Sequence, residues 1–210
     1  MQLTFFMEGI LRSIHSRCTD NKQRFAIQPQ VNITQWKIVT GAMPFMLALL
    51  FSGACATIPK GVQAVSPFDA DKYLGKWYEI ARLDFKFEKD LNNTTAEYSL
   101  NEDGTIKVVN RGYNYVKKEW KEAIGKAKFV ESPDIAKLKV SFFGPFYAGY
   151  NVVALDKDYR YALVIGKSPK YMWILSREKT IPEEIRKDYL RKAKEIGVKT
   201  EKLIWVKHDK

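Results

Sequence analysis

The chain has 210 residues, of which 46% are apolar and 28% charged, a composition typical of a folded soluble domain with appended segments. Two His and two Cys, the latter 37 positions apart, are too few for a zinc finger, a multi-histidine site or a disulfide-rich scaffold, so we expect no metal and no cofactor. The formal net charge of +11 suits nucleic acid, an anionic membrane surface or an acidic ligand, and the position of the charges must decide.

An uncharged apolar run, IVTGAMPFMLALLFSGACA, occupies residues 38–56 directly after Lys37. A basic residue, a short apolar core and small residues before a cysteine are the layout of a secretory signal. The ending Ser52-Gly53-Ala54-Cys55 resembles the lipobox of bacterial lipoproteins, with Ser52 in the place of the usual Leu, and the resemblance implies that Cys55 is lipidated. A membrane-spanning helix that is never cleaved is the alternative interpretation.

The first third of the chain is therefore expected to be separate from the fold. We interpret residues 1–36 as an untranslated or disordered extension, 37–54 as the signal peptide and 55–66 as a lipidated tether. Removing residues 1–54 takes five of the 35 Lys and Arg and two of the 24 Asp and Glu, so 30 and 22 remain, with a net charge of +8. Most of the basic excess belongs to the folded part.

From Pro67 onward, short strand patterns alternate with turn signals. Turn sequences such as 101–104 and Gly144-Pro145 leave only a few residues between strands, which is typical of neighbours in an antiparallel meander. The expected strands are 76–83, 94–100, 105–112, 120–129, 136–142, 150–155, 161–165 and 171–176. Eight such strands predict an all-β, eight-stranded antiparallel up-and-down β-barrel, because closure removes the exposed edges of an open sheet.

The hydrophobic period becomes helical after the eighth strand. Apolar residues at 185, 189, 193 and 196 share one face of a predicted C-terminal α-helix over 181–197, which we expect to pack outside the barrel. Thr180 and Glu183 are predicted to form a capping box at its start, and Gly197 is placed to end it. The apolar stretch 203–206 predicts a short extra strand.

Three motifs in this region resemble the lipocalin signatures. Gly75-Lys76-Trp77 stands at the start of the first strand, Asp158-Tyr159 between the sixth and seventh, and Arg177 directly after the eighth. Residues 67–210 thus resemble the lipocalin domain of bacterial outer-membrane lipoprotein lipocalins, a group related to animal apolipoprotein D. The resemblance implies a barrel that binds a small hydrophobic ligand, attachment to the outer membrane facing the periplasm, and a context of membrane maintenance or stress.

The order of an up-and-down barrel brings these motifs to one end. The start of strand one, the turn between strands six and seven and the end of strand eight share that end. We therefore expect Gly75, Trp77, Tyr159 and Arg177 to meet as a structural floor, in which the guanidinium lies over the indole.

The loops after strands one, three, five and seven must then surround the open mouth. These loops combine aromatic side chains with six lysines, at positions 86, 89, 117, 118, 167 and 170. Such a rim suits an apolar ligand that ends in an anion, and we predict a fatty acid or a lysophospholipid.

Strand alternation places one face of each strand inside the barrel. Ala81 and Leu100 are expected to point inward, as is Glu79, whose buried carboxylate needs a partner unless a β-bulge intervenes. The residues expected to contact the ligand are Tyr98, Val108, Asn110, Tyr113, Phe129, Val140, Phe142, Phe146, Tyr147 and Trp173.

The sequence predicts a binding protein rather than an enzyme. In the barrel region no His precedes His208 and no Cys follows Cys55, so Ser-His and Cys-His nucleophilic pairs are unavailable. The export signal and the scattered lysines disfavour a nucleic-acid partner. A lipocalin-fold enzyme acting on a lipid or isoprenoid, and a binder of another small hydrophobic ligand, are the alternatives; a homodimer is one option for assembly.

Overall fold

A computed structural model describes residues 57–210, which belong to one compact unit, Ala54–Lys210. The expected extension, the signal peptide and Cys55 lie outside the described residues. Within the described part of the chain, no helix combines the length and the apolar character that crossing a bilayer requires.

The strands follow the predicted order. In sequence the elements are α2 (Ala70–Tyr73), β1 (Gly75–Leu83), β2 (Leu91–Leu100), β3 (Ile106–Asn114), β4 (Glu119–Phe129), β5 (Lys137–Phe143), β6 (Phe146–Leu155), β7 (Tyr161–Ile165), β8 (Met172–Ser176), α3 (Glu183–Glu195), η1 (Thr200–Lys202) and β9 (Leu203–Trp205). The eight barrel strands, the outer helix and the short extra strand are thus confirmed. Several strands begin earlier than predicted; β6 starts at Phe146 because Phe143 pairs with Phe146 across a turn of only two residues.

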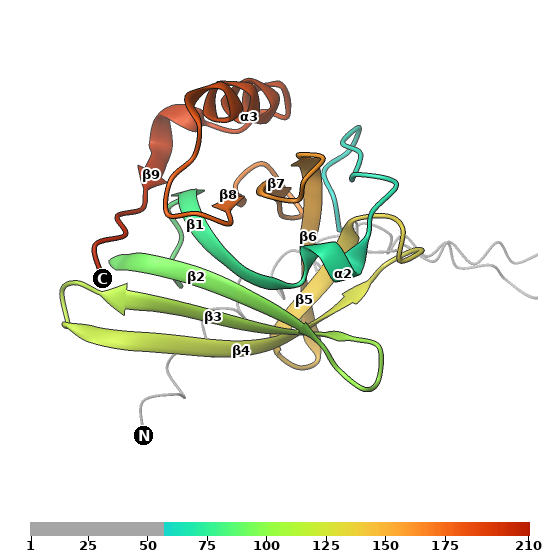
Figure 1. Ribbon diagram of the computed structural model, residues 1–210, viewed down its shortest axis with the longest axis horizontal. Coiled ribbons are helices and arrows are strands. Elements are labelled where there is room, and N and C mark those ends of the chain that lie inside the picture. The colour runs from blue at the N-terminus through green and yellow to red at the C-terminus, as the bar shows by residue number, and fades with distance from the viewer. Residues whose placement is uncertain (1–56) are drawn as a thin grey trace, which may run out of the picture. The chain divides into compact units, whose positions relative to one another are not determined.

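All strand pairs are antiparallel, and the pairing of β1 with both β8 and β2 closes the barrel. Strands β1 and β2 pair only from Gly75 opposite Tyr98 to Tyr78 opposite Thr95. Beyond that point β9 lies beside β1 in place of β2. The backbone amide of Asn93 donates to the backbone carbonyl of Lys207 (2.8 Å). The C-terminal segment therefore joins the two strands where they separate (Figure 1).

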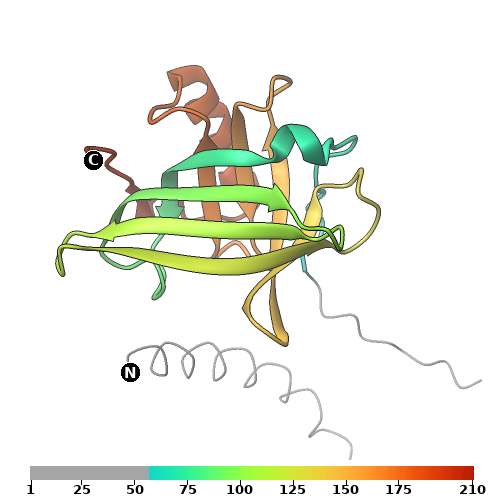
Figure 2. The ribbon, with the colours of Figure 1, turned by 60° about the horizontal axis from the view of Figure 1, so that its bottom comes forward.

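The barrel has two distinct ends. We call the end where β1 begins the floor; it carries α2, the turns 101–105, 130–136 and 156–160, and the start of the β8–α3 connection 177–182. We call the opposite end the mouth; it carries the loop 84–90, the β3–β4 hairpin tip 115–118 and the turns 144–145 and 166–171. Figure 2 shows α2 and the β3–β4 hairpin at opposite ends of the long strands.

Two apolar clusters fill the molecule. One lies inside the barrel, and the other lies between its outer surface and α3, where Tyr189 and Ala193 are buried. The Tyr189 hydroxyl donates to the Tyr161 carbonyl (2.9 Å), which fixes the helix on the barrel wall. Figure 1 shows α3 over β7 and β8.

The predicted capping box is wrong, although the helix itself is confirmed. Pro182 is the N-cap and has no polar side-chain atom with which to make a cap bond, and the Glu183 carboxylate instead accepts two hydrogen bonds from Arg186 (2.6 and 2.8 Å). Gly197, with φ of +90°, follows the end of the helix, as expected.

Residues 57–68 run along the barrel wall from the mouth side to the floor. The Thr57 carbonyl accepts a bond from the Asn151 side chain (2.7 Å), and the Val65 amide donates to the Val152 carbonyl (2.8 Å). Phe68 is buried against the interior cluster beside Tyr73. The segment therefore belongs to the folded unit from Thr57 onward.

Candidate functional site

The floor is built around one cation–indole contact. The guanidinium carbon of Arg177 lies 3.9 Å from the ring centroid of the fully buried Trp77. Arg177 donates to the carbonyls of Lys72 and Leu74, both at 2.9 Å, and of Lys76 at 2.8 Å. Partial burial lowers the pKa of Arg177, and these carbonyls compensate for the water that the charge has lost.

Two further floor residues are placed as the motif order predicted. Gly75 has φ of +88°, and its α-carbon faces Arg177, so a side chain there would be strained. The Tyr159 carbonyl accepts a bond from Arg177 Nε (3.2 Å), while the Tyr159 ring packs on Phe68. Arg177 therefore links Trp77 to Tyr159.

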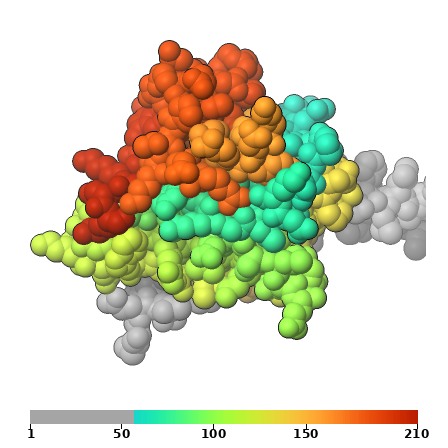
Figure 3. All heavy atoms as spheres, in the orientation of Figure 1, coloured from blue at the N-terminus to red at the C-terminus, as the bar shows by residue number. Residues whose placement is uncertain are grey.

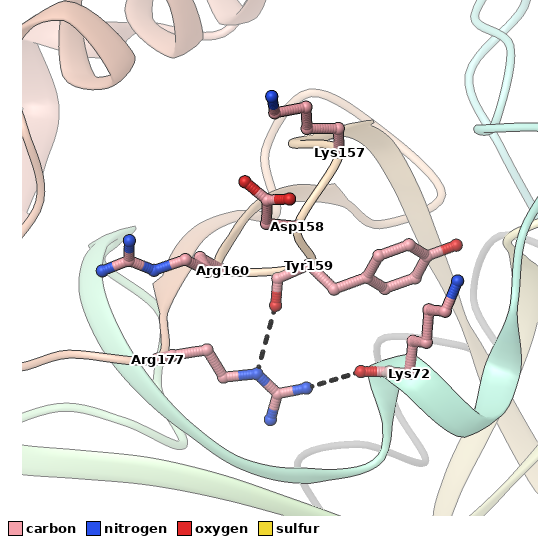
Figure 4. Close-up of a pocket in the computed structure, with 6 residues that line it drawn as sticks. All are labelled: Lys72, Lys157, Asp158, Tyr159, Arg160 and Arg177. Carbon is pink, nitrogen blue, oxygen red and sulfur yellow. Dashed lines mark hydrogen bonds between the residues drawn. The ribbon is translucent and has the colours of Figure 1, made fainter.

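A pocket of about 420 Å³ lies on the floor next to Arg177 (Figure 4). Its walls come from α2, the β6–β7 turn and the residue after β8, and its lining is Lys72, Lys157, Asp158, Tyr159, Arg160 and Arg177. Figure 4 shows Lys157, Asp158 and Arg160 pointing away from the guanidinium of Arg177. This pocket is polar and open, which does not suit an alkyl chain.

The barrel interior is lined mainly by apolar and aromatic side chains. Tyr98 and Val108 are buried members of the interior cluster. Four more of the predicted ligand contacts are half-buried and pack against that cluster: Phe129, Val140, Phe142 and Trp173. Alternation along β2, β3, β4, β5 and β8 therefore placed these six side chains correctly at the interior, while their contact with a ligand stays a prediction.

Three tyrosine hydroxyls form a polar spot near the floor. Tyr150 contacts both Tyr73 and Tyr98 through hydroxyl hydrogen bonds of 2.8 Å. Burial raises the pKa of all three phenols, so they stay neutral at physiological pH. Only Tyr98 was singled out from the sequence, because β6 was expected to begin at Tyr150, where alternation offers little guidance.

A second arginine, which is fully buried, organises the mouth. Arg82, 1% exposed, donates to the Glu79 carboxylate (2.7 Å) and to the carbonyls of Glu88 (2.8 Å) and Leu91 (2.9 Å). Its Nε lies 3.6 Å from the Glu88 carboxylate, which also accepts a bond from Trp173 Nε1 (3.2 Å). Arg82 is thus the partner that Glu79 required, and it ties the loop 84–90 to β1.

Two carboxylates share this one guanidinium. Burial raises the pKa of Glu79, against the opposing effect of Arg82. Burial and the negative charge of Glu79 hold the pKa of Glu88 well above its usual range. The cluster therefore holds a proton more readily than exposed glutamates do.

A β-bulge explains why the sequence did not reveal this cluster. Glu79 pairs with Leu175, but Ala81 pairs with Ile174, so Ile80 is an extra residue in β1. The bulge was one of the expected alternatives. Beyond it the faces exchange, which turns Ala81 to the outer cluster and Arg82 inward, so the inward assignment of Ala81 is wrong.

Other predicted positions also differ from the structure. Leu100 is 59% exposed at the end of β2 and does not line the interior. Tyr113 lies opposite the exposed Trp120, with ring centroids 5.5 Å apart, on the outer face of β3 and β4. Tyr147 lies under Lys128 and Lys139, with both amines within 5.5 Å of its ring centroid, also outside. The side chains of Leu100, Tyr113 and Tyr147 therefore lie away from the barrel interior.

The remaining candidates lie closer to the opening. Phe146 is half-buried next to the β5–β6 turn. Asn110 is half-buried, and its Oδ1 is buried without a hydrogen-bond partner among the described residues. Phe142 also borders a second pocket of about 470 Å³, which opens on the outside where β4 and β5 separate.

Among the described residues, no group of three or more His, Cys, Asp or Glu side chains is arranged so that it could hold a metal ion. The acidic residues of the mouth cluster are instead paired with Arg82.

The family described as "Lipocalin-like domain" matches residues 68–208. The chain is 54% identical over 156 residues to the outer membrane lipoprotein Blc of Citrobacter freundii, covering 73% of this chain and 88% of that protein. It is 47% identical over 166 residues to Blc of Vibrio cholerae, covering 79% and 97%. Apolipoprotein D of Rattus norvegicus is 38% identical over 125 residues, covering 56% and 65%.

Solved structures share the fold. Insecticyanin from the tobacco hornworm Manduca sexta superposes with a TM-score of 0.56 at 23% identity, covering 70% of this chain and 84% of that chain. The cockroach allergen Per a 4 gives 0.56 at 20% identity, covering 72% and 94%. At these identities the similarity shows the barrel architecture alone.

Proposed function

The chain belongs to the lipocalin family, and we propose that it is an outer-membrane lipoprotein whose barrel binds a fatty acid or a lysophospholipid. The observation that carries this proposal is the interior face of apolar and aromatic side chains, closed at the floor by Trp77 and Arg177. Burial of an alkyl chain there would contribute about 0.8 kcal/mol per methylene group.

The polarity of the two ends supports one orientation of the ligand. A charged head group placed at the floor would lose its hydration among neutral tyrosines, which is costly. At the mouth, lysines and water remain accessible. We therefore place the alkyl chain inside and the head group at the mouth.

Entry of the chain requires side-chain movement. Both pockets described above open to the outside. The half-buried rings of Phe129, Phe142 and Trp173 are the side chains that would change rotamer to admit a ligand. Asn110 Oδ1 then provides an acceptor for a ligand hydroxyl group or a water molecule.

A displacement assay tests the interior site. We expect Phe142→Asp and Trp173→Asp to weaken binding of a fluorescent fatty acid and its displacement by lysophospholipid at least about tenfold, because each places a carboxylate beside the alkyl chain. Tyr147→Asp, on the outer face, is the matched control and should bind as the unchanged protein does. Unchanged affinity in both interior variants would refute the assigned lining.

The membrane attachment has its own test. The relatives named as outer membrane lipoproteins, and the sequence before Cys55, support lipidation of that cysteine and a periplasm-facing domain. We expect Cys55→Ser to release the protein into the soluble periplasmic fraction. Continued attachment would instead support the uncleaved-helix interpretation.

Two further predictions concern activity and assembly. We predict no enzymatic activity, which turnover of a bound lipid would contradict. A homodimer is an option for assembly that the mass measured by sedimentation tests.

A further inference from the structure

We propose that the mouth of the barrel faces the lipid bilayer, with the β3–β4 hairpin tip against anionic lipid head groups; this orientation rests on the proposed anchor at Cys55. Three independent features of the described residues support it. They are the place where the folded chain begins, the apolar side chains at the rim and the difference in charge between the two ends.

The folded chain begins on the mouth side of the barrel. Thr57 packs on Gly149 of β6, next to the backbone amide of Lys167 in the β7–β8 turn, which is a mouth turn. Asn151 joins Thr57 to the carbonyl at the end of β7 (3.0 Å). Cys55 precedes Thr57 by two residues, which span at most about 7 Å. An anchor there holds the mouth side, rather than the floor, close to the membrane.

The hairpin tip presents apolar surface at the same end. Val116 is 64% exposed, Tyr115 51% and Trp120 57%. Lys117, Lys118 and Lys121 lie among them. Aromatic and apolar side chains next to lysines are the combination that settles into the head-group region of a membrane. Figure 3 shows the hairpin projecting beyond the body of the barrel.

Charge separates the mouth from the floor. The four mouth connections, 84–90, 115–118, 144–145 and 166–171, contain six lysines and three carboxylates. The four floor connections, 101–105, 130–136, 156–160 and 177–182, contain seven carboxylates and four basic residues. The floor also exposes Leu100 and Val130, so apolar exposure alone does not select an end. An anionic surface attracts the mouth and repels the floor.

This orientation shortens the path of a lipid. A single-chain lipid leaving the bilayer would meet the mouth before it reached bulk water, and its head group would stay near the mouth lysines. The exchange would need no second protein.

Quenching by bromine-labelled lipid tests the orientation. The full chain is used with Cys18→Ser, and a bimane label is attached at Val116→Cys on the mouth or at Glu102→Cys on the floor. The nine-residue strand β3 separates these two positions by about 30 Å. Each protein is inserted into vesicles of phosphatidylethanolamine and phosphatidylglycerol with brominated acyl chains. We expect loss of most of the bimane fluorescence at 116 and little change at 102. Equal quenching, or stronger quenching at 102, overturns the orientation.

A charge-removal series, independent of the anchor, tests the surface itself. In the Cys55→Ser protein, Lys117→Gln with Lys167→Gln should weaken sedimentation with phosphatidylglycerol-containing vesicles about 30-fold, because each lysine near the surface contributes about 1 kcal/mol, or about fivefold. Lys157→Gln with Lys179→Gln at the floor should change it little. Equal losses in both pairs, or none at the mouth, contradict the proposal. The mass of the peptide that contains Cys55, from the membrane-purified protein, shows separately whether this cysteine is lipidated. The proposed anchor and the proposed orientation are therefore contradicted by different results.

Discussion

The floor and the mouth are each organised around one arginine, partly buried at the floor and buried at the mouth, but the two guanidinium groups have different partners. Arg177 at the floor lies over Trp77 and donates to backbone carbonyls. Arg82 at the mouth is paired with the carboxylates of Glu79 and Glu88. Carbonyls do not titrate, whereas carboxylates do. The floor is therefore a fixed closure, while the mouth is an end whose stability responds to pH.

The largest expected effect lies at the floor. Trp77→Ala should lower the free energy of unfolding by about 3 to 5 kcal/mol, because it removes a fully buried indole and the surface on which Arg177 lies. Trp120→Ala, at the exposed start of β4, is the matched control and should change stability by no more than about 0.5 kcal/mol. Urea unfolding measures both, and comparable losses would show that the floor is not special.

Breaking the mouth cluster should have the next largest effect. Arg82→Met leaves the buried carboxyl group of Glu79 and the partly buried one of Glu88 without their cation, and we expect a loss of about 3 kcal/mol. Adding Glu79→Gln and Glu88→Gln should restore most of that loss, since no buried charge is then left unpaired. A triple variant as unstable as Arg82→Met would show that the arginine acts through packing rather than through charge.

The smallest effect, and the sharpest contrast between the ends, is the dependence on pH. Because burial raises the pKa of Glu79 and Glu88 above the ordinary value of 4.5, the folded protein binds these protons more tightly than the unfolded chain. The stability that the folded protein gains from this tighter proton binding is complete below pH 4.5, and it is lost as pH rises through the raised pKa values of the two glutamates. Unfolding followed across this range should show declining stability with rising pH, and Glu88→Gln should flatten the decline.

A floor variant provides the control for that experiment. Gly75→Ala should cost about 1 to 2 kcal/mol, because its φ of +88° is unfavourable for a residue with a β-carbon. The cost should be the same at every pH, so the slope should match that of the unchanged protein. A slope unaltered by Glu88→Gln would mean that the mouth cluster does not govern the pH response.

Much of the floor could be predicted from the sequence because its parts are motifs at strand ends. Gly75-Lys76-Trp77 and Arg177 mark positions that barrel topology alone brings together, and no detail of register is needed. The interior face of β2 to β5 followed from alternation for a similar reason, since these strands pair without interruption across Tyr98, Val108 and Phe129.

The mouth could not be predicted as well, because small irregularities change which face a side chain takes. One extra residue at Ile80 reverses the faces of β1, which hid the role of Arg82. Tyr113 and Tyr147 were expected in mouth loops, but β3 continues to Asn114 and β6 begins at Phe146, so strand alternation places both tyrosines outside. Bulges and tight turns leave a weak signal in a single sequence.

The central claim is that the closed floor and the accessible mouth enclose an apolar site for a single-chain lipid. Native mass spectrometry of the membrane-purified protein, followed by extraction and identification of bound lipid, tests it most directly. We expect about one fatty acid or lysophospholipid per barrel, and its loss in Phe142→Asp. A protein that carries no lipid, and takes up none from vesicles, would contradict the account.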